Sequence, residues 1–415
     1  MELLKNRGLK FSYLGASVFF LVLSTFSFGN VNALQFIFRV GGLSLSVLFA
    51  LLFFFSRPKS TLCDHTYAGR LNGLGQGTRF KVSARVFYIF IAFFTIASTA
   101  AISAVWAPDP IFSLWKSIEI LLVLIVVSLL FSRINCLRQC WHAIHLFFLS
   151  LQIILLSSIS LNVILGSPDF TLLAGYFPII NPNSVGALSA LCVIYYFVIR
   201  RFSFACFWLL IVLMSGSRTA LIALLLCLLL QYVILKSQSR LSAGINRVIA
   251  GGSFFLIVGF LAQEIAVFWE EAQELSGRRI IWESYINFYT HGKGLFDYVF
   301  GIGIGSTRSF YNFIDDVHRR VSFHNAWLEV FVSSGVIALF MFFIIFIYCL
   351  YFLLRLTSRE GGGGVLARVL FFSLVLISVR SFSASNFSSL TPELVLLFFI
   401  SFTVVKSKIM LAREA

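Results

Sequence analysis

Long apolar runs alternate with short polar segments along almost the whole chain. Each run is continuous, and most are long enough for a helix of roughly 20 residues, the length that crosses a bilayer. Barrel strands would alternate in polarity instead, so the pattern predicts an all-α integral membrane protein. We expect about twelve transmembrane helices by this length criterion. They are placed at residues 11–28, 33–55, 86–106, 111–131, 143–165, 184–199, 203–215, 219–235, 246–268, 326–354, 366–385 and 391–405.

One polar stretch interrupts this pattern. Residues 269–325 separate two expected spans and carry most of the polar chemistry of the chain, so we predict one large loop there. The whole chain, 1–415, is expected to form a single polytopic membrane domain. The short runs 203–215 and 219–235 fit either two spans or one re-entrant element.

Composition and charge set the orientation. Hydrophobic residues make up 59% of the chain and charged residues 12%, whereas soluble domains carry about a quarter charged residues. Of the 32 Lys and Arg residues, 22 fall in segments on the side of the N-terminus and seven on the opposite side. By the positive-inside rule, both termini are cytoplasmic and the large loop is periplasmic. The net charge of +15 reflects this bias and does not indicate a nucleic-acid partner.

The seven cysteines agree with this orientation, because none falls in an expected outer loop, where an oxidising compartment would favour pairing. Cys136 and Cys140 have no partners at zinc-site spacing. We therefore expect no metal and no cofactor.

A short corner, Ser215–Arg218, separates two apolar runs on the outer side. The guanidinium of Arg218 stays charged and offers a fork of donors, which suits phosphate. The alternative is an interfacial arginine that reaches lipid headgroups. Ser217 belongs to the same corner and is a further candidate for binding.

The large loop holds more cations. Arg278 and Arg279 are adjacent, so on a helix they cannot both face one ligand, and one of them is expected to point at a site. Charge balance by Glu270 and its acidic neighbours is the alternative. Glycines in Gly301–Ser306 lack the spacing and context of a nucleotide-binding loop, and we expect them to allow a close backbone approach to a glycan or a tight turn.

Histidine is the side chain best suited to proton transfer near neutral pH. His324 lies where the loop becomes the next span, beside Asn325, and is the candidate base. His318 and His291 are competitors, and a helix cap is the alternative role for His324. In an earlier outer segment Asn183 is either a ligand donor or a helix cap.

Few charges lie within the expected spans. Arg380 lies near the outer end of its span and needs a partner, which is a phosphate, Glu393 or a helix carbonyl. Lys116 and Glu119 are three residues apart and are expected to pair.

The order of these outer segments resembles the O-antigen ligase and O-antigen polymerase superfamily of bacterial envelope glycan transferases. The resemblance covers about residues 85–350. The residues that carry it are Ser103, Ala104, Val105, Trp106, Asp109, Pro110, Asn181, Pro182, Asn183, Ser217, Arg218, Gly277, Arg278, Trp282, Gly301, Ile302, Gly303, His324, Asn325 and Gly335.

The resemblance implies a GT-C-type membrane glycosyltransferase of the inner membrane that works without a metal. Such enzymes move a glycan from undecaprenyl pyrophosphate to an acceptor on the periplasmic side, which is lipid A-core for ligases and another lipid-linked glycan for polymerases. It implies His324 as the catalytic residue and Arg218 and Arg278 as pyrophosphate ligands, with Arg279 as an additional cation.

Ligase, polymerase and protein O-glycosyl ligase share these motifs, and we favour a ligase because the outer loop is compact. A glycolipid transporter or flippase is the alternative from another class. Transporters carry internal repeats and polar residues near the midplane. The sequence shows no repeat, and few charges lie within its spans.

Overall fold

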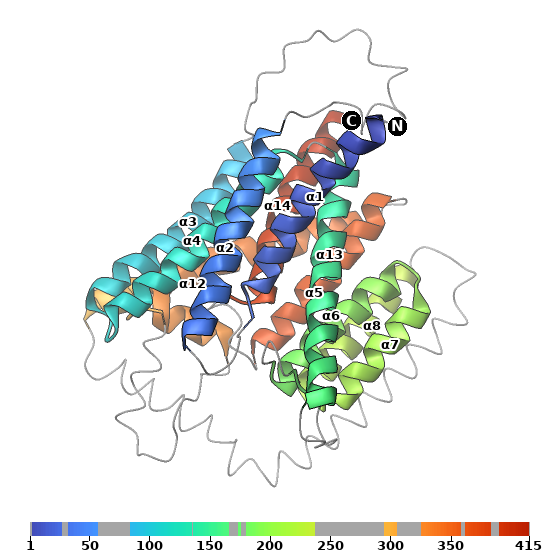
Figure 1. Cartoon of the computed structure of the whole chain (residues 1–415). Coiled ribbons are helices and arrows are strands. Elements are labelled where there is room, and N and C mark those ends of the chain that lie inside the picture. Colours follow the sequence, from blue (N-terminus) through green and yellow to red (C-terminus); the bar gives the residue numbers. More distant parts are fainter. Residues whose placement is uncertain are drawn as a thin grey trace, which may run out of the picture.

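The computed structural model describes residues 2–26, 32–56, 84–134, 136–165, 173–175, 180–236, 294–304, 325–357, 362–382 and 390–414. Within these ranges the regular elements are helices, apart from one isolated bridge between Gly175 and Ile180. The expected all-α architecture is confirmed for this part of the chain (Figure 1). The elements are α1 (Glu2–Leu23), α2 (Asn32–Phe55), α3 (Ala84–Ser103), η2 (Ala104–Trp106), α4 (Pro110–Ser132), α5 (Leu137–Leu165), α6 (Pro182–Val198), α7 (Phe202–Met214), α8 (Arg218–Lys236), α11 (Leu295–Phe300), α12 (Ala326–Thr357), α13 (Gly362–Ser381) and α14 (Pro392–Glu414).

Six described stretches are long and apolar enough to cross a membrane, which is consistent with a multi-pass membrane protein but falls short of the expected number of spans. They are Ile37–Phe55, Tyr88–Trp106, Pro110–Ser132, Leu137–Ile164, Ala326–Thr357 and Gly362–Ser381. Shorter apolar helices cover Tyr13–Leu23, Pro182–Val198, Phe202–Met214 and Arg218–Tyr232. The expected span 246–268 lies outside the described residues.

The region 203–235 forms two helices, α7 and α8, which meet at the Ser215–Ser217 corner. Helix α7 has 13 residues and is therefore about 20 Å long. The hydrocarbon core of a bilayer is about 30 Å thick, so α7 alone is too short to cross it.

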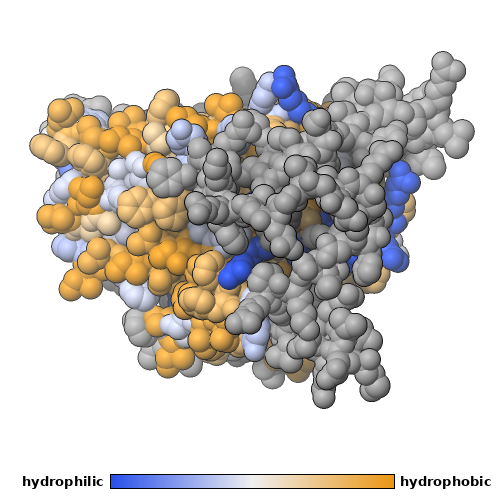
Figure 2. Space-filling model, turned by 90° about the horizontal axis from the view of Figure 1, so that it is seen from above, coloured by the Kyte–Doolittle hydropathy of each residue, from blue (hydrophilic) through white to orange (hydrophobic). Residues whose placement is uncertain are grey.

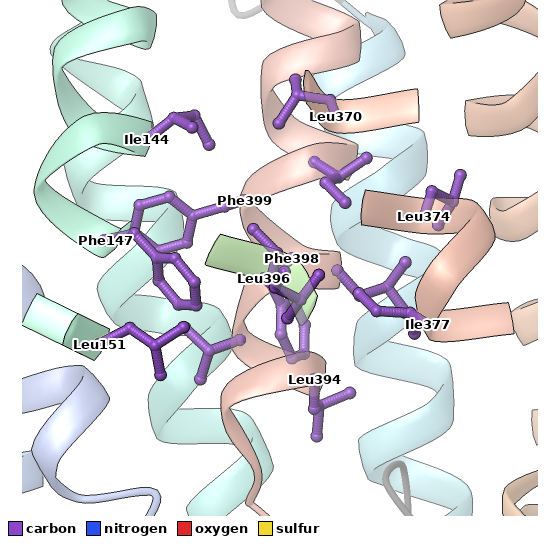
Figure 3. Close-up of a cluster of buried hydrophobic side chains, with 14 of the residues drawn as sticks. Ile144, Phe147, Leu151, Leu370, Leu374, Ile377, Leu394, Leu396, Phe398 and Phe399 are labelled. Atoms are coloured by element: carbon purple, nitrogen blue, oxygen red, sulfur yellow. The ribbon is translucent and has the colours of Figure 1, made fainter. Parts of the chain in front are cut away.

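Helix α14 lies in the middle of the bundle. Every residue from 392 to 405 is buried, so this helix is apolar around its whole circumference. Figure 3 shows Phe398 and Phe399 of α14 between side chains of α5, such as Phe147, and of α13, such as Leu374. The ring centroids of Phe147 and Phe399 are 5.7 Å apart. Helix α14 thus connects the two sides of the core.

The two termini mark one end of the bundle (Figure 1). At this end Lys406 Nζ donates to the carbonyl oxygen of Ile134 at 3.1 Å, which joins α14 to the α4–α5 turn. Described basic residues gather at the same helix ends, namely Arg133, Arg138, Arg200, Arg201, Lys236 and Arg355. The opposite end, which we call the far end, carries Ser103, Pro182, Ser217, Ser333, Arg380 and Glu393.

The outside of the bundle is suited to lipid. Seen from the end with the termini, apolar residues cover much of the described surface on one side of the molecule (Figure 2). Large apolar side chains on the outer faces of α2, α4, α7 and α12 are exposed, and Leu48, Ile118, Leu210 and Phe340 are examples. In water such a surface would be costly, and in a bilayer it is the expected exterior.

Helix α12 is broken at Gly335, whose φ of 79° and ψ of 179° are not helical. The Trp327 ring stacks on Phe343 with centroids 4.7 Å apart and lies edge-on to Phe346 at 5.4 Å. In a straight helix, residues 16 apart would be separated by about 24 Å. Residues 326–334 therefore fold back toward residues 336–357. The expected span over 326–354 is therefore interrupted, because Gly335 allows this reversal.

Charges inside the bundle are paired. Lys116 Nζ lies 2.8 Å from Glu119 Oε2, which confirms the expected pair. Arg39 of α2 joins it, with Nη1 at 3.5 Å from the same oxygen. Arg39 was not predicted as a partner, because it is 80 positions away in the sequence. The pairing lowers the cost of holding these charges away from water.

Candidate functional site

The Ser215–Ser217 corner is built by a close approach of α7, α8 and α6. Gly216 has a φ of 63°, a conformation that glycine adopts without strain. Gly186 of α6 faces the corner, and a Cβ added there would come 2.3 Å from Ser215 Oγ and 2.5 Å from Ser217 Cβ. Ser217 N donates to Ser215 Oγ at 3.3 Å. The corner is therefore fixed by packing against α6.

A hydrogen bond carries this link to the first turn of α6. Ser217 Oγ donates to the carbonyl oxygen of Asn183 at 3.4 Å. The N-cap of α6 is Asn181, whose side chain accepts from Ser184 N at 2.7 Å. The reading of Asn183 as the cap is therefore wrong by two residues. Asn183 is exposed and lies at the far end.

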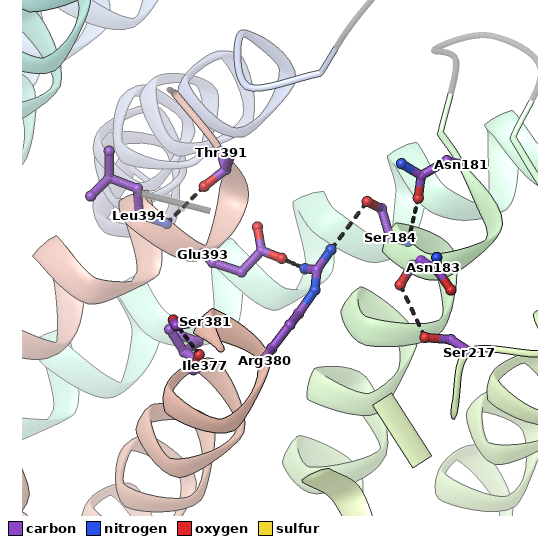
Figure 4. A network of polar contacts seen from close by, with 10 residues as sticks. All are labelled: Asn181, Asn183, Ser184, Ser217, Ile377, Arg380, Ser381, Thr391, Glu393 and Leu394. Atoms are coloured by element: carbon purple, nitrogen blue, oxygen red, sulfur yellow. Dashed lines mark hydrogen bonds and ion pairs between the residues drawn. The ribbon is translucent and has the colours of Figure 1, made fainter. Parts of the chain in front are cut away.

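Arg380 extends the same network from α13. Its Nη2 donates to Ser184 Oγ at 3.1 Å, and its guanidinium forms an ion pair with Glu393 at the start of α14 (Figure 4). Both side chains of the pair are at least nine-tenths buried. Of the three partners considered from the sequence, the structure shows Glu393.

Arg218 is the first residue of α8 and follows the corner directly. It is exposed, whereas Ser217 beside it is buried. The unpaired backbone N–H groups at a helix N-terminus favour anions, and α6 and α8 both begin in this network. Arg218 therefore begins α8 directly after a fixed corner that contacts the first turn of α6.

A second polar arrangement lies at the break in α12. Residues Gly301–Ile304 run beside residues 332–335, and we call this contact the clasp. Ile302 N donates to Val332 O at 2.9 Å and Gly303 N donates to Ser333 O at 3.0 Å. A Cβ on Gly301 would lie 2.4 Å from Ser333 C, and one on Gly335 would lie 2.2 Å from Val299 O. These glycines allow two backbones to touch within the protein.

Side chains of the Ser103–Trp106 motif and of α4 hold the clasp. Trp106 Nε1 donates to Gly301 O at 2.9 Å, and Ser103 Oγ donates to Ser333 O at 3.2 Å. Ser113 Oγ donates to Ile304 O at 2.8 Å. The approach of Gly301 and Gly303 to a glycan stays a prediction. What these glycines approach within the described residues is the backbone of α12.

Asn325 begins the first turn of α12. Its Oδ1 accepts from Leu328 N at 3.1 Å, so it is the N-cap of this helix. Glu329, one turn later, is buried. His324 precedes Asn325 and lies outside the described residues, as do His318, His291, Arg278 and Arg279. Their expected roles stay predictions.

Comparison with known proteins shows a similarity to one family. A family model described as O-antigen ligase matches residues 202–343. The resemblance to the O-antigen ligase and polymerase superfamily is thereby confirmed. The matched O-antigen ligase segment contains the Ser215–Arg218 corner and both backbone segments that form the clasp. No curated protein sequence matches the chain.

The match supports an O-antigen ligase- or polymerase-type activity on lipid-linked glycans, carried by a multi-pass bacterial membrane protein. Asn183, Ser184, Arg380 and Glu393 lie outside the O-antigen ligase segment, yet they contact its corner or each other. Among the described residues, no cluster of three or more His, Cys, Asp or Glu side chains has the arrangement of a metal site.

Sequence reasoning missed Ser184 and Gly186. Their signal is weak, because a serine and a glycine in an apolar helix are also common where helices pack. Residues of the clasp were noticed as motifs, but the contacts that Trp106 and Ser103 make with it join positions about 200 residues apart and could not be read from spacing.

Proposed function

We propose that the protein is an O-antigen ligase-like glycosyltransferase of the bacterial inner membrane. It moves a glycan from undecaprenyl pyrophosphate to the lipid A-core acceptor on the periplasmic side, in an inverting, metal-independent displacement of GT-C type. The observation that carries the proposal is Arg218, exposed on a rigid corner inside the matched O-antigen ligase segment. The far end then faces the periplasm, and donor and acceptor meet there.

Arg218 binds the pyrophosphate in this proposal. A guanidinium presents several N–H donors in a plane and remains charged, so it stabilises the negative charge that grows on the leaving group. Arg218 begins α8, and the N-terminus of this helix favours the same charge. Arg278, or its neighbour Arg279, supplies a second cation from the large loop, and Ser217 and Asn183 are further candidates for polar contacts.

His324 is the general base. The acceptor hydroxyl attacks the anomeric carbon of the donor sugar, and His324 takes the hydroxyl proton. The bond between that carbon and the pyrophosphate oxygen breaks, and lipid pyrophosphate leaves with the electron pair. One direct displacement inverts the configuration at the anomeric carbon. The residue that immediately follows His324 is Asn325, the N-cap of α12.

Arg380 supports the site rather than acting as a ligand in this proposal. Its buried guanidinium forms an ion pair with Glu393 and donates a hydrogen bond to Ser184 Oγ. Through Ser184 it fixes the first turn of α6, against which the Ser215–Ser217 corner before Arg218 packs. The pairing of Arg39 and Lys116 with Glu119 also leaves these charges engaged within the bundle, which weighs against a transport pathway through them.

A polymerase of the same superfamily is the second candidate, because the family match supports both activities. The lipopolysaccharide of a deletion strain distinguishes them. Loss of long chains with accumulation of lipid-linked polymer indicates a ligase, whereas core carrying a single repeat indicates a polymerase. An unchanged profile would contradict both, and transfer from an undecaprenyl-pyrophosphate donor to protein would indicate a protein O-glycosyl ligase.

A further inference from the structure

The far end carries exposed apolar side chains both at the ends of two expected spans and in the large loop. It consists of Val105, Trp106, Ile111, Leu295 and Phe296, and we call it the aromatic ledge. Leu295 and Phe296 are 77% and 70% exposed, and Val105 and Ile111 are 79% and 83% exposed. The sequence places Leu295 and Phe296 in a loop expected to face water. In water, the exposure of several large apolar side chains at one end of the molecule would be unfavourable.

The ledge is held rigidly to the helix bundle. Trp106 Nε1 donates to Gly301 O, and its ring meets Phe300 edge-on with centroids 6.3 Å apart. Phe300 stacks with Phe296 at 6.3 Å. Gly301 N donates to Asp297 O and ends α11 directly before the clasp. The exposed side chains of α11 are therefore fixed relative to η2, the short helix that precedes α4.

The ledge continues a surface that already faces lipid. On α4 the exposed residues Ile111, Leu114, Ile118 and Ile125 follow each other at spacings of three, four and seven positions, which is one face of a helix. Helix α4 is one of the helices long and apolar enough to cross the membrane. Ile111 belongs to both the face and the ledge, and Trp106, four residues before α4, contacts Phe300 of α11, so the ledge connects this face to α11.

We infer that the aromatic ledge is inserted into the far leaflet of the bilayer, where it contacts the outer part of the acyl chains. Tryptophan and other aromatic residues are enriched at this depth, since their rings tolerate the boundary between hydrocarbon and headgroups. A short apolar segment that lies in this boundary adds membrane contact without crossing it. The insertion places the clasp, which adjoins α11, at the headgroup level. Lipid is the occupant that continuity with the α4 face supports.

Site-directed spin labelling of the full chain in lipid nanodiscs tests this inference. Nitroxides are placed singly at residues 296 and 105, in a chain whose native cysteines are replaced and whose membrane insertion has been verified. Position 118 on α4 is the lipid-facing reference, and Gly294→Cys is the matched neighbour, because a side chain there meets only one atom, at 4.0 Å. We expect positions 296 and 105 to collide with oxygen several-fold more than with a water-soluble nickel chelate, as position 118 does. Position 294 is expected to favour the chelate.

Two results would overturn the inference. Chelate collisions at 296 as frequent as at 294 would place the ledge in water. Protection of 296 from both reagents would mean that a second copy or another protein covers it. The unmodified chain provides an independent measurement with lipids that carry a photoreactive group on the acyl chain. Crosslinks in the peptide containing residues 295–300 are expected, and their absence alongside crosslinks in α4 would contradict the inference. Neither measurement depends on glycan transfer.

Discussion

Arg380 Nη2 donates to Ser184 Oγ at 3.1 Å, a contact that joins the end of α13 to the start of α6. Glu393 balances the charge of Arg380 from α14. Asn183, the residue before Ser184, accepts a hydrogen bond from Ser217. Helices α6, α13 and α14 and the corner before Arg218 therefore share one network. A group buried in the bundle thus sets the position of a group exposed at its surface.

Removing one member of this ion pair should be more harmful than removing both. Arg380→Met leaves the Glu393 carboxylate buried without its cation, which typically costs about 3–5 kcal/mol. We expect a clear fall in the midpoint of heat-induced aggregation of the detergent-solubilised protein. Arg380→Met combined with Glu393→Leu should recover much of the loss. A double variant less stable than Arg380→Met would contradict the pairing.

Arg218→Lys should lower glycan transfer substantially while the protein stays in the membrane. Lysine keeps the charge but loses the planar fork of donors. The measurement is transfer by purified protein from a lipid-linked donor, with Arg201→Lys at the opposite end of the bundle as the matched control. Arg278→Lys should resemble Arg218→Lys. If both transfer at the rate of the unaltered protein, the pyrophosphate ligands lie elsewhere, and Arg279 becomes the candidate.

His324→Ala should abolish detectable transfer, because general base catalysis typically contributes about 10²–10⁴-fold. His318→Ala and His291→Ala should have milder effects. Transfer by the unaltered protein should fall as the pH drops through the pKa of the imidazole, about 6.5 for an unperturbed histidine, since only the neutral ring accepts a proton. The rates are measured between pH 5 and 8. Full activity in His324→Ala with loss in His318→Ala would assign the base to His318.

Gly335→Ala should destabilise the protein, because the φ of 79° is strained for alanine and its Cβ would lie 2.2 Å from Val299 O. The backbone conformation alone costs about 1–3 kcal/mol. Gly41→Ala on α2 is the matched control, since a Cβ there meets no atom within 4 Å. It should be neutral or slightly stabilising. Equal thermal midpoints for both variants would show that the break in α12 does not require glycine.

Orientation can be tested with single cysteines and a membrane-impermeant thiol reagent on intact spheroplasts. We expect labelling at position 294, in the large loop, and protection at position 201, between α6 and α7. This follows from the uneven distribution of Lys and Arg across the membrane. Labelling at 201 with protection at 294 would reverse the assignment of both ends.

The sequence predicts helices well where a long apolar run decides the outcome, as in α4 and α5. It predicts the Lys116–Glu119 pair because three positions along a helix bring two side chains together. It does not predict the break at Gly335, since an apolar run looks the same whether it continues or reverses. Contacts across the bundle, such as Trp106 with Gly301, depend on tertiary packing and leave no local pattern.

The buried position of α14 has a consequence for biosynthesis. This helix is synthesised after α5 and α13, yet it fills the space between them (Figure 3). Until it arrives, the earlier helices lack the partner that their inner faces require, and Arg380 lacks Glu393. The bundle therefore matures only after α14 has been synthesised, and a chain cut short before residue 390 would present apolar and charged surfaces that quality-control proteases recognise.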